Sequence, residues 1–351
     1  MPRQQHIVVI GASAGGIEAL LHIVEKLPPD FPAPIFVTVH IPPDAPSLLP
    51  QILTRRGQLT AKHAEDGEHY KPGVIYVAPP DYHLLINRNG RNGTLRVVRG
   101  PRGNRHRPAI DPLFRSAAAA AGTHVIGVIL SGNLDDGTAG LLAIKERGGV
   151  AVVQDPSEAM HASMPQSAIE NVPVDHIVRL REIPRKLSEL VAAETRSADL
   201  TGKVPEVMDM ENRIAAMDDR TMQEDDRPGR PSAFSCPDCG GVLWEINDGD
   251  YIRFRCRVGH AFSPESMLAG QNEVLEQALW AALKTLEETA RMSNRLAATE
   301  RGRGHGWMAA RFEEREKDAR QRADAIRKFL MSATSEVPQV DAELEAEVPE
   351  R

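Results

Sequence analysis

The stretch Ile7–Gly16, with the sequence IVVIGASAGG, decides the fold of the first half of the chain. It opens with four β-branched residues in a row, which is typical of a strand buried on both faces of a parallel sheet. The small residues that follow allow a sharp turn into a helix. Similar apolar runs recur along the chain and are expected to be strands: Ile35–His40, Val74–Ala78, Val125–Ser131, Val150–Gln154 and His176–Leu180.

Helices are expected between these runs, at Gly16–Leu27, Asp111–Ala121, Thr138–Arg147 and Ile183–Glu194. The alternation predicts an α/β domain over residues 5–198, with a doubly wound, mostly parallel, Rossmann-like sheet. One stretch departs from this pattern. Leu84–Val98 contains a turn rich in Asn and Gly, which indicates an antiparallel hairpin.

Ser13 occupies the middle of the turn after the first expected strand. A dinucleotide-binding loop would have glycine there and an acidic residue about 20 residues on, where the second strand instead ends in His40. Both differences argue against a nucleotide site. The segment Gly11–Gly15 also fits Gly-x-Ser-x-Gly, a turn that presents a serine nucleophile, with N–H groups near Ala14 and Gly15 as candidate oxyanion donors. A serine that only caps the helix is the alternative.

Three side chains with the chemistry of a catalytic triad are expected at one edge of the sheet. Ser13 and His40 lie at the ends of the first two strands, and Asp136 follows the strand Val125–Ser131. Because the carboxyl ends of parallel strands share one edge, His40 can act as base for Ser13 while Asp136 orients the imidazole. Taken singly, His40 could be structural, and Asp135 or Asp136 could cap the next helix.

Six segments in order along the chain carry a family resemblance. They are Val8–Gly16, Val39–Pro42, Tyr76–Pro79, Arg105–Ala117, Leu130–Gly137 and Met164–Pro165. Through these segments the chain resembles the catalytic domain of the chemotaxis protein-glutamate methylesterase (CheB) family. The resemblance implies that Ser13, His40 and Asp136, and not Asp135, form the triad.

The resemblance also implies an activity. The family hydrolyses γ-glutamyl methyl esters on chemoreceptors with release of methanol, and many members also deamidate receptor glutamines. Both reactions are acyl transfers on a glutamyl side chain, so one site can perform both. We therefore expect a carboxylic ester hydrolase that uses no cofactor for catalysis and whose partner is a methylated chemoreceptor-like protein.

Further residues are expected to line the site. The basic segment Arg105–Pro108, with Arg107 as the candidate substrate-binding residue, could bind the acidic surface around a methylation site or stabilise the oxyanion. A solvated basic loop is the alternative. The resemblance implies that Met164 faces the site, although it could simply lie at a helix start, and that Asn133 belongs to the oxyanion loop.

The sequence departs from the family pattern in three ways. A typical member carries a phosphoacceptor receiver domain before the catalytic domain, and none precedes Ile7, so control by phosphorylation in cis is not expected. The family loop Gly-Met-Gly-x-Asp-Gly reads GNLDDG at Gly132–Gly137. A long C-terminal extension follows. The altered loop motivates a second hypothesis, in which the chain is a scaffold or regulatory protein with a vestigial esterase domain and acts through a zinc ribbon and helices in the extension.

The extension contains all three cysteines of the chain. Cys236 and Cys239 form a CxxC pair, and Cys256 and His260 form a CxxxH pair. Three thiolates and one imidazole suit a tetrahedral structural Zn²⁺ site, so we expect a zinc-ribbon-like module over residues 233–268. A redox CxxC or a Cys236–Cys239 disulfide is the alternative, but it leaves Cys256 and His260 unexplained. Few basic residues accompany the site, so contact with protein is expected rather than with nucleic acid.

The remaining segments are expected to be a flexible polar linker at 199–232, a helical hairpin at 269–331 and a disordered acidic tail at 332–351. In the hairpin, apolar residues recur at three- and four-residue spacings on both sides of Arg301–Gly304. This periodicity predicts two helices that fold back on each other or mediate self-association with another subunit. An amphipathic pair that serves only for packing is the alternative.

Composition narrows the classes of function. The net charge of the 351 residues is -7, which argues against a general nucleic-acid binder. No apolar run reaches the length of a membrane-spanning helix, and the apolar run near the N-terminus is too short for a signal-peptide core. We therefore expect a cytoplasmic protein with no direct membrane insertion.

Overall fold

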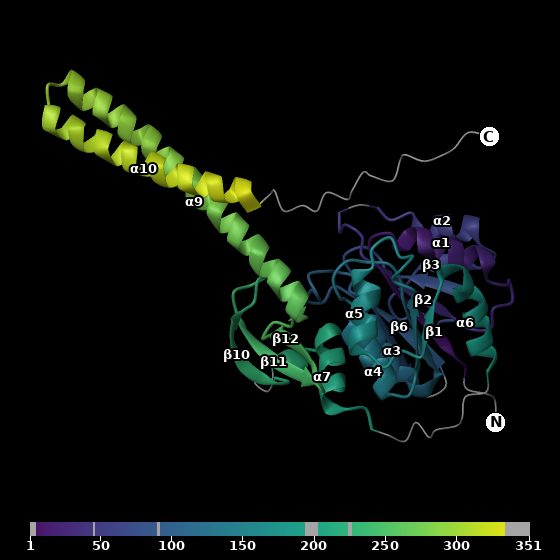
Figure 1. Ribbon diagram of the computed structural model, residues 1–351. Coiled ribbons are helices and arrows are strands. Elements are labelled where there is room, and N and C mark those ends of the chain that lie inside the picture. Colours follow the sequence, from purple (N-terminus) through teal and green to yellow (C-terminus); the bar gives the residue numbers. More distant parts are fainter. Residues whose placement is uncertain (1–4, 45, 90–91, 194–202, 224–226, 334–351) are drawn as a thin grey trace, which may run out of the picture. The chain divides into compact units, whose positions relative to one another are not determined.

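The structure is a computed structural model that describes residues 5–44, 46–89, 92–193, 203–223 and 227–333 (Figure 1). The chain divides into two compact units, Met1–Leu268 and Ala269–Arg351. The first unit holds the predicted α/β domain and the cysteine-containing module, and the second holds most of the helical hairpin.

A seven-stranded parallel sheet forms the core of the α/β domain. The strand order is β3-β4-β2-β1-β7-β8-β9. In that order the strands are Thr60–His63, Val74–Val77, Ile35–Val39, Ile7–Ala12, Val125–Ile129, Val150–Gln154 and His176–Val178. The predicted doubly wound parallel sheet is confirmed. Because β1 lies between β2 and β7, the loops that follow these three strands are neighbours at one edge.

Side chains of β1 alternate between the two faces of the sheet. Val8 and Ile10 join the apolar cluster on one face, and Ile7 and Val9 join the cluster on the other. The first cluster includes residues of α1 (Gly16–Lys26), α2 (Leu49–Arg56) and α6 (Ile183–Ala192). The second includes residues of α3 (Ile110–Ala121), α4 (Thr138–Glu146) and α5 (Ser163–Asn171). Short 3-10 turns lie at Gly122–His124 and Leu180–Glu182.

The expected hairpin forms a separate two-stranded antiparallel sheet. Its strands are β5 (His83–Asn89) and β6 (Asn92–Val98). The hairpin packs against α3, where Ile86 N donates to Ser116 Oγ at 3.0 Å. This sheet supports the helix that begins beside the candidate site.

The cysteine-containing module is a four-stranded antiparallel sheet. Its strands are β10 (Arg230–Ser235), β11 (Val242–Asp248), β12 (Tyr251–Cys256) and β13 (Ala261–Phe262), in that order. Strands β11 and β12 pair from Leu243 opposite Cys256 to Asp248 opposite Tyr251 and form the central hairpin of this sheet. The outer strands β10 and β13 lacked the apolar runs that identify buried strands.

The polar stretch that was expected to be a flexible linker contains two helices, α7 (Glu206–Ala215) and α8 (Asp219–Gln223). Glu211 of α7 is fully buried and forms ion pairs with Arg115 of α3 at 3.3 Å, with Arg255 of β12 at 2.8 Å, and with Arg253. Burial alone would raise the pKa of Glu211, but the three guanidinium charges hold it well below its usual range. Ion pairs with distant residues therefore order α7.

The second unit is an antiparallel helical hairpin, as predicted. Helix α9 (Pro264–Gly302) begins at the end of the first unit, and α10 (Gly306–Ala333) returns along it. Asn294 Nδ2 donates to Glu316 Oε1 at 3.0 Å. The core of the pair contains Leu283, Ala323 and Leu330. Self-association through these helices stays a prediction.

The predicted boundaries at 198/199 and at 331/332 stay predictions as well. Residues 194–202 and 334–351 lie outside the described residues, and Ser332 and Ala333 end α10. Of the helices in the described part of the chain, none is long and apolar enough to cross a membrane.

Candidate active site and metal centre

Ser13 lies on the tight turn between β1 and α1. Its N–H donates to Ser131 O at 3.0 Å, and its carbonyl accepts from Gly16 N at 2.9 Å. Gly15 has a φ of 70°, a left-handed conformation that favours glycine. A Cβ at Gly132 would lie 2.8 Å from Ser13 Cβ, so the loop after β7 approaches the serine closely.

The three side chains expected from sequence come together at this edge. His40 Nδ1 lies 3.1 Å from Ser13 Oγ, and His40 Nε2 lies 2.7 Å from Asp136 Oδ2. The side chains of His40 and Asp136 are 6% and 2% exposed. The result is one continuous hydrogen-bonded chain from a half-buried hydroxyl to a buried carboxylate.

Four donors surround the Asp136 carboxylate. Oδ2 accepts from His40 and from Ile110 N at 2.7 Å, while Oδ1 accepts from Asn104 Nδ2 at 2.9 Å and Asp111 N at 3.3 Å. Burial would raise the pKa of Asp136, but the hydrogen bond and charge of His40 and the other donors hold it well below its usual range. Asp136 is therefore an anion at neutral pH.

The anion settles the tautomer of His40. An ionised carboxylate can only accept hydrogen bonds, so the ring nitrogen facing Asp136, Nε2, carries a proton. In the neutral ring, Nδ1 is then the acceptor and Ser13 Oγ–H donates to it. This is the protonation state in which an imidazole can remove a proton from a serine hydroxyl.

His106 stacks on His40, a contact that sequence reasoning missed. The two ring centroids are 3.6 Å apart and the rings are within 10° of parallel. Burial, followed by the charge of His40, lowers the pKa of His106 to about 4. His106 is therefore neutral at pH 7 and can hold the plane of the His40 ring without opposing a positive charge on it. His106 lies inside the basic segment Arg105–Pro108, for which the sequence predicted a role only for Arg107.

The remaining residues expected at the site are Ala14, Gly15, Asn133 and Met164, and they differ in exposure and in hydrogen bonding. No hydrogen bond within the described part of the chain uses the N–H of Ala14 or Gly15. Asn133 is exposed, and Met164 is buried with its N–H donating to Gly132 O at 3.0 Å. Met164 thus fixes the loop that approaches Ser13.

Arg107, the expected substrate-binding residue, is engaged by the protein itself. Its guanidinium is 2.6 Å from Asp81 Oδ1 and donates to Gly100 O at 2.8 Å. The side chain is 16% exposed. A direct role of Arg107 toward substrate stays a prediction, and in the structure it braces the loop that carries His106.

A comparison with known protein families gives a match to the family described as CheB methylesterase over residues 8–187, more than half of the 351 residues. The chain belongs to the CheB methylesterase family. The match ends before α7 and the cysteine-containing module.

Curated relatives in this family include a protein-glutamate methylesterase/protein-glutamine glutaminase of Pectobacterium atrosepticum. It is 39% identical over 189 residues, which cover 54% of each chain. A counterpart in Geobacter metallireducens is 42% identical over 183 residues, covering 52% of this chain and 50% of that one. The chain spans about half the length of the curated relatives it matches. The crystal structure of the Thermotoga maritima CheB methylesterase catalytic domain is also similar, with 39% identity and a TM-score of 0.52 over 54% of this chain and 100% of that one.

The loop before Asp136 departs from the CheB pattern at Leu134. The structure shows the backbone conformation of this residue and the contacts that hold the next one. Leu134, which stands where the pattern has glycine, has a φ of 60°. A left-handed conformation costs a non-glycine residue about 1–2 kcal/mol. The next residue, Asp135, is held at both oxygens: Ser263 Oγ donates to Oδ1 at 2.6 Å, and Tyr251 Oη donates to Oδ2 at 3.2 Å. Burial raises the pKa of Asp135 to about 7, although the Ser263 hydrogen bond opposes the shift.

The four expected metal ligands also come together. The ligand atoms of Cys236, Cys239, Cys256 and His260 all lie within 4.8 Å of one another. Cys239 Sγ is 3.8 Å from Cys256 Sγ, and His260 Nδ1 is 3.7 and 3.6 Å from the sulfurs of Cys236 and Cys256.

These distances fit a tetrahedral metal. Zn–S bonds of about 2.3 Å and a Zn–N bond of about 2.1 Å imply separations of about 3.8 Å between sulfurs and about 3.6 Å between sulfur and nitrogen. Each ligand pair lies on a tight turn, with Gly240 at φ 73° and Gly259 at φ 101°. The cluster could therefore bind a metal such as zinc.

Proposed function

We propose that the chain is a protein-glutamate methylesterase whose nucleophile is Ser13. The observation that carries this proposal is the hydrogen-bonded chain from Ser13 through His40 to the buried Asp136. The family and the names of the curated relatives support it.

In the proposed reaction, His40 Nδ1 accepts the Ser13 hydroxyl proton as Oγ attacks the γ-carbonyl carbon of a glutamyl methyl ester. The tetrahedral intermediate collapses, and the proton on His40 passes to the methoxy oxygen, which leaves as methanol. A water molecule then attacks the glutamyl ester on Ser13, with His40 again as base, and the free glutamate and the serine hydroxyl are restored. The anionic Asp136 stabilises the imidazolium in both halves.

In this proposal, backbone N–H groups stabilise the oxyanion of the tetrahedral intermediate. Those of Ala14 and Gly15 lie in the turn at the start of α1, where the positive end of the helix dipole favours developing negative charge. A glutamine side chain presents the same carbonyl with an amine leaving group, so deamidation would follow the same steps.

The proposed substrate is a methylated chemoreceptor-like protein, and the test is methanol release from it. We expect release by the full chain and loss of at least about a thousandfold in rate in Ser13→Ala, because the nucleophile is absent. Equal rates in the two proteins would refute the esterase, and the alternative of a scaffold with a vestigial esterase domain would then gain support.

We further propose that Cys236, Cys239, Cys256 and His260 hold a structural Zn²⁺. A full set of four protein ligands is typical of structural sites, since catalytic zinc keeps an open position. The expected zinc content of the purified chain is one ion per molecule, falling in Cys239→Ser. A chain purified with no zinc, and unable to take it up, would contradict this assignment.

A further inference from the structure

The cysteine-containing module contacts the CheB domain on the loop Arg102–Asn104, which lies next to the triad. Ala261 of β13 accepts from Asn104 N at 2.7 Å and donates to Arg102 O at 3.1 Å. Gly103 pairs with Ala261 as a parallel bridge. This loop of the catalytic domain therefore pairs with β13 of the module through its backbone.

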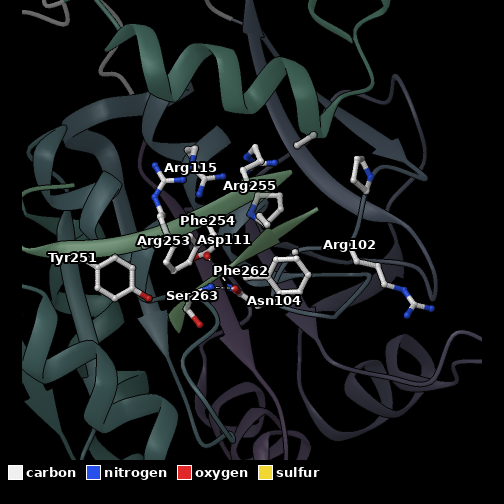
Figure 2. A pocket seen from close by; sticks show the side chains of 16 residues that line it. Arg102, Asn104, Asp111, Arg115, Tyr251, Arg253, Phe254, Arg255, Phe262 and Ser263 are labelled. Atoms are coloured by element: carbon white, nitrogen blue, oxygen red, sulfur yellow. Dashed lines mark hydrogen bonds between the residues drawn. The ribbon is translucent and has the colours of Figure 1, made fainter. Parts of the chain in front are cut away.

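Asn104 links this contact to the triad. Its side chain is 4% exposed, and its amide nitrogen donates to Asp136 Oδ1 at 2.9 Å and Asp111 Oδ2 at 3.0 Å. Its amide oxygen accepts from Ser263 N at 2.9 Å and Ser266 Oγ at 3.0 Å. All four hydrogen-bonding positions of the amide are therefore used, two by carboxylates of the CheB domain and two by the module. Asn104 is drawn beside Asp111 and Ser263 in Figure 2.

The two donors from the module fix which way the amide faces. If Ser263 and Ser266 were absent, the Asn104 oxygen would lose both protein partners, and the amide could turn away from Asp136. Asp136 would then lose one of four donors, and its position against His40 Nε2 would be less restricted. The same Ser263 also holds Asp135 through Oδ1 at 2.6 Å, so the module holds the loop on both sides of the catalytic carboxylate.

The metal ligands lie immediately before these contacts in the chain. His260 precedes Ala261, and the turn Cys256–His260 packs on the same loop, since a Cβ at Gly259 would lie 2.7 Å from Pro101 Cγ. A metal that fixes this turn also fixes the register of β13 against Asn104. The turn and β13 are short segments, and a structural metal commonly supplies the stability that such small modules lack.

We propose that the Cys3His module positions the catalytic triad. Metal binding acts on Asp136 through Asn104, which is the positioning residue. The proposal rests on the proposed esterase function of Ser13. It gives the extension a role in catalysis that no part of the family match covers, since that match ends at residue 187.

The test uses the full chain with zinc bound, its Cys239→Ser variant, and two serine variants of the module. Ser266→Ala removes one donor to Asn104. The matched control is Ser232→Ala, whose hydroxyl donates to Leu243 O at 2.8 Å and accepts from Phe234 N at 3.2 Å, both within the module. For each protein the zinc content, the kcat and KM of methanol release, and the labelling rate of Ser13 by a fluorophosphonate are measured.

A further readout does not depend on activity. The His40 proton shared with Asp136 is followed as a downfield proton NMR signal, assigned by its loss in His40→Gln. We expect Cys239→Ser and Ser266→Ala to lower kcat and the labelling rate by about ten- to a hundredfold, which matches loss of a hydrogen bond to a charged group. KM should stay within about twofold and the NMR signal should weaken, while Ser232→Ala matches wild type.

The outcomes separate the two proposals. Wild-type kcat and an unchanged NMR signal in zinc-free Cys239→Ser and in zinc-loaded Ser266→Ala would overturn the module's role and leave the esterase intact. Absence of methanol release and of labelling in every protein would overturn the esterase. In that case the downfield His40 proton signal still tests the module. A signal that zinc loss leaves unchanged would also overturn the positioning role of Asn104, and a signal that is lost together with zinc would support that role. If Cys239→Ser lowers helical content outside the module, the comparison rests on Ser266→Ala.

Discussion

Replacing Asp136 by asparagine exchanges one carboxylate oxygen for an amide NH₂ group and leaves the size of the side chain unchanged. The carboxylate accepts four hydrogen bonds, at 2.7 Å from His40, 2.7 Å from Ile110, 2.9 Å from Asn104 and 3.3 Å from Asp111. An asparagine has one acceptor oxygen and must turn its NH₂ group toward either the first pair of donors or the second.

In the first orientation the NH₂ group faces His40 Nε2, which can accept a hydrogen bond only after the ring changes tautomer. The proton then moves to Nδ1, and Nδ1 no longer accepts from Ser13. In a triad of this kind the wrong tautomer lowers kcat by about 10⁴, or about 5.5 kcal/mol of barrier. The second orientation sets NH₂ against two N–H donors, and each donor left unpaired costs about 1–3 kcal/mol of folding stability.

The assay for Asp136→Asn is methanol release together with urea unfolding followed by circular dichroism. We expect a fall in kcat of about 10³–10⁴ with KM changed little, because substrate does not contact Asp136. Asp135→Asn is the comparison variant, since Asp135 is equally buried but bonds to Ser263 and Tyr251 and not to His40, so its kcat should fall far less than that of Asp136→Asn. A kcat for Asp136→Asn within tenfold of wild type would refute the assigned roles of Asp136 and His40.

Three other substitutions test the charges and packing around the site. Glu211→Gln leaves the buried guanidinium groups of Arg115 and Arg255 without their counter-charge and Arg253 with Asp248 alone. It should lower the unfolding free energy by about 3–5 kcal/mol in urea titrations, whereas an unchanged midpoint would contradict the ion-pair assignment. Asp135 has a pKa raised from 3.8 to about 7, so its contribution to stability is complete below pH 4 and is lost as the pH rises through 7. The stability of Asp135→Asn relative to wild type should therefore increase between pH 4 and pH 7 in thermal scans, and a constant difference would refute the shift. Gly132→Ala places a Cβ 2.8 Å from Ser13 Cβ, and the labelling rate of Ser13 should fall by more than about tenfold, with wild-type labelling as the contrary result.

The parallel sheet could be predicted because each central strand is a continuous run of β-branched residues, as in Ile7–Ile10, and such runs need no knowledge of their neighbours. The edge strand Thr60–His63 could not, since its side chains are only partly buried and its sequence, TAKH, has no apolar run. The triad followed from the same reasoning. Parallel topology brings the ends of β1, β2 and β7 to one edge, so Ser13, His40 and Asp136 could be placed together before any distance was known.

The contacts between the module and the CheB domain could not be predicted from the sequence, for a physical reason. Asn104 and Ser263 are 159 residues apart, and Glu211 and Arg255 are 44 apart, and no periodicity links residues in different modules. The polar stretch around Glu211 predicts a linker, because charged residues are usually exposed to solvent. Only the three arginines that converge on it make its burial favourable.

The most direct test of the catalytic triad is covalent labelling of the full chain by a fluorophosphonate, with the modified peptide mapped by mass spectrometry. Such a probe reacts with a serine only when a neighbouring base activates it, so the labelling reports Ser13 and His40 together. The triad predicts a single adduct on Ser13, abolished in Ser13→Ala and slowed by at least about a thousandfold in His40→Gln. An unlabelled Ser13 in wild type, or an adduct that forms at the same rate in His40→Gln, would contradict it.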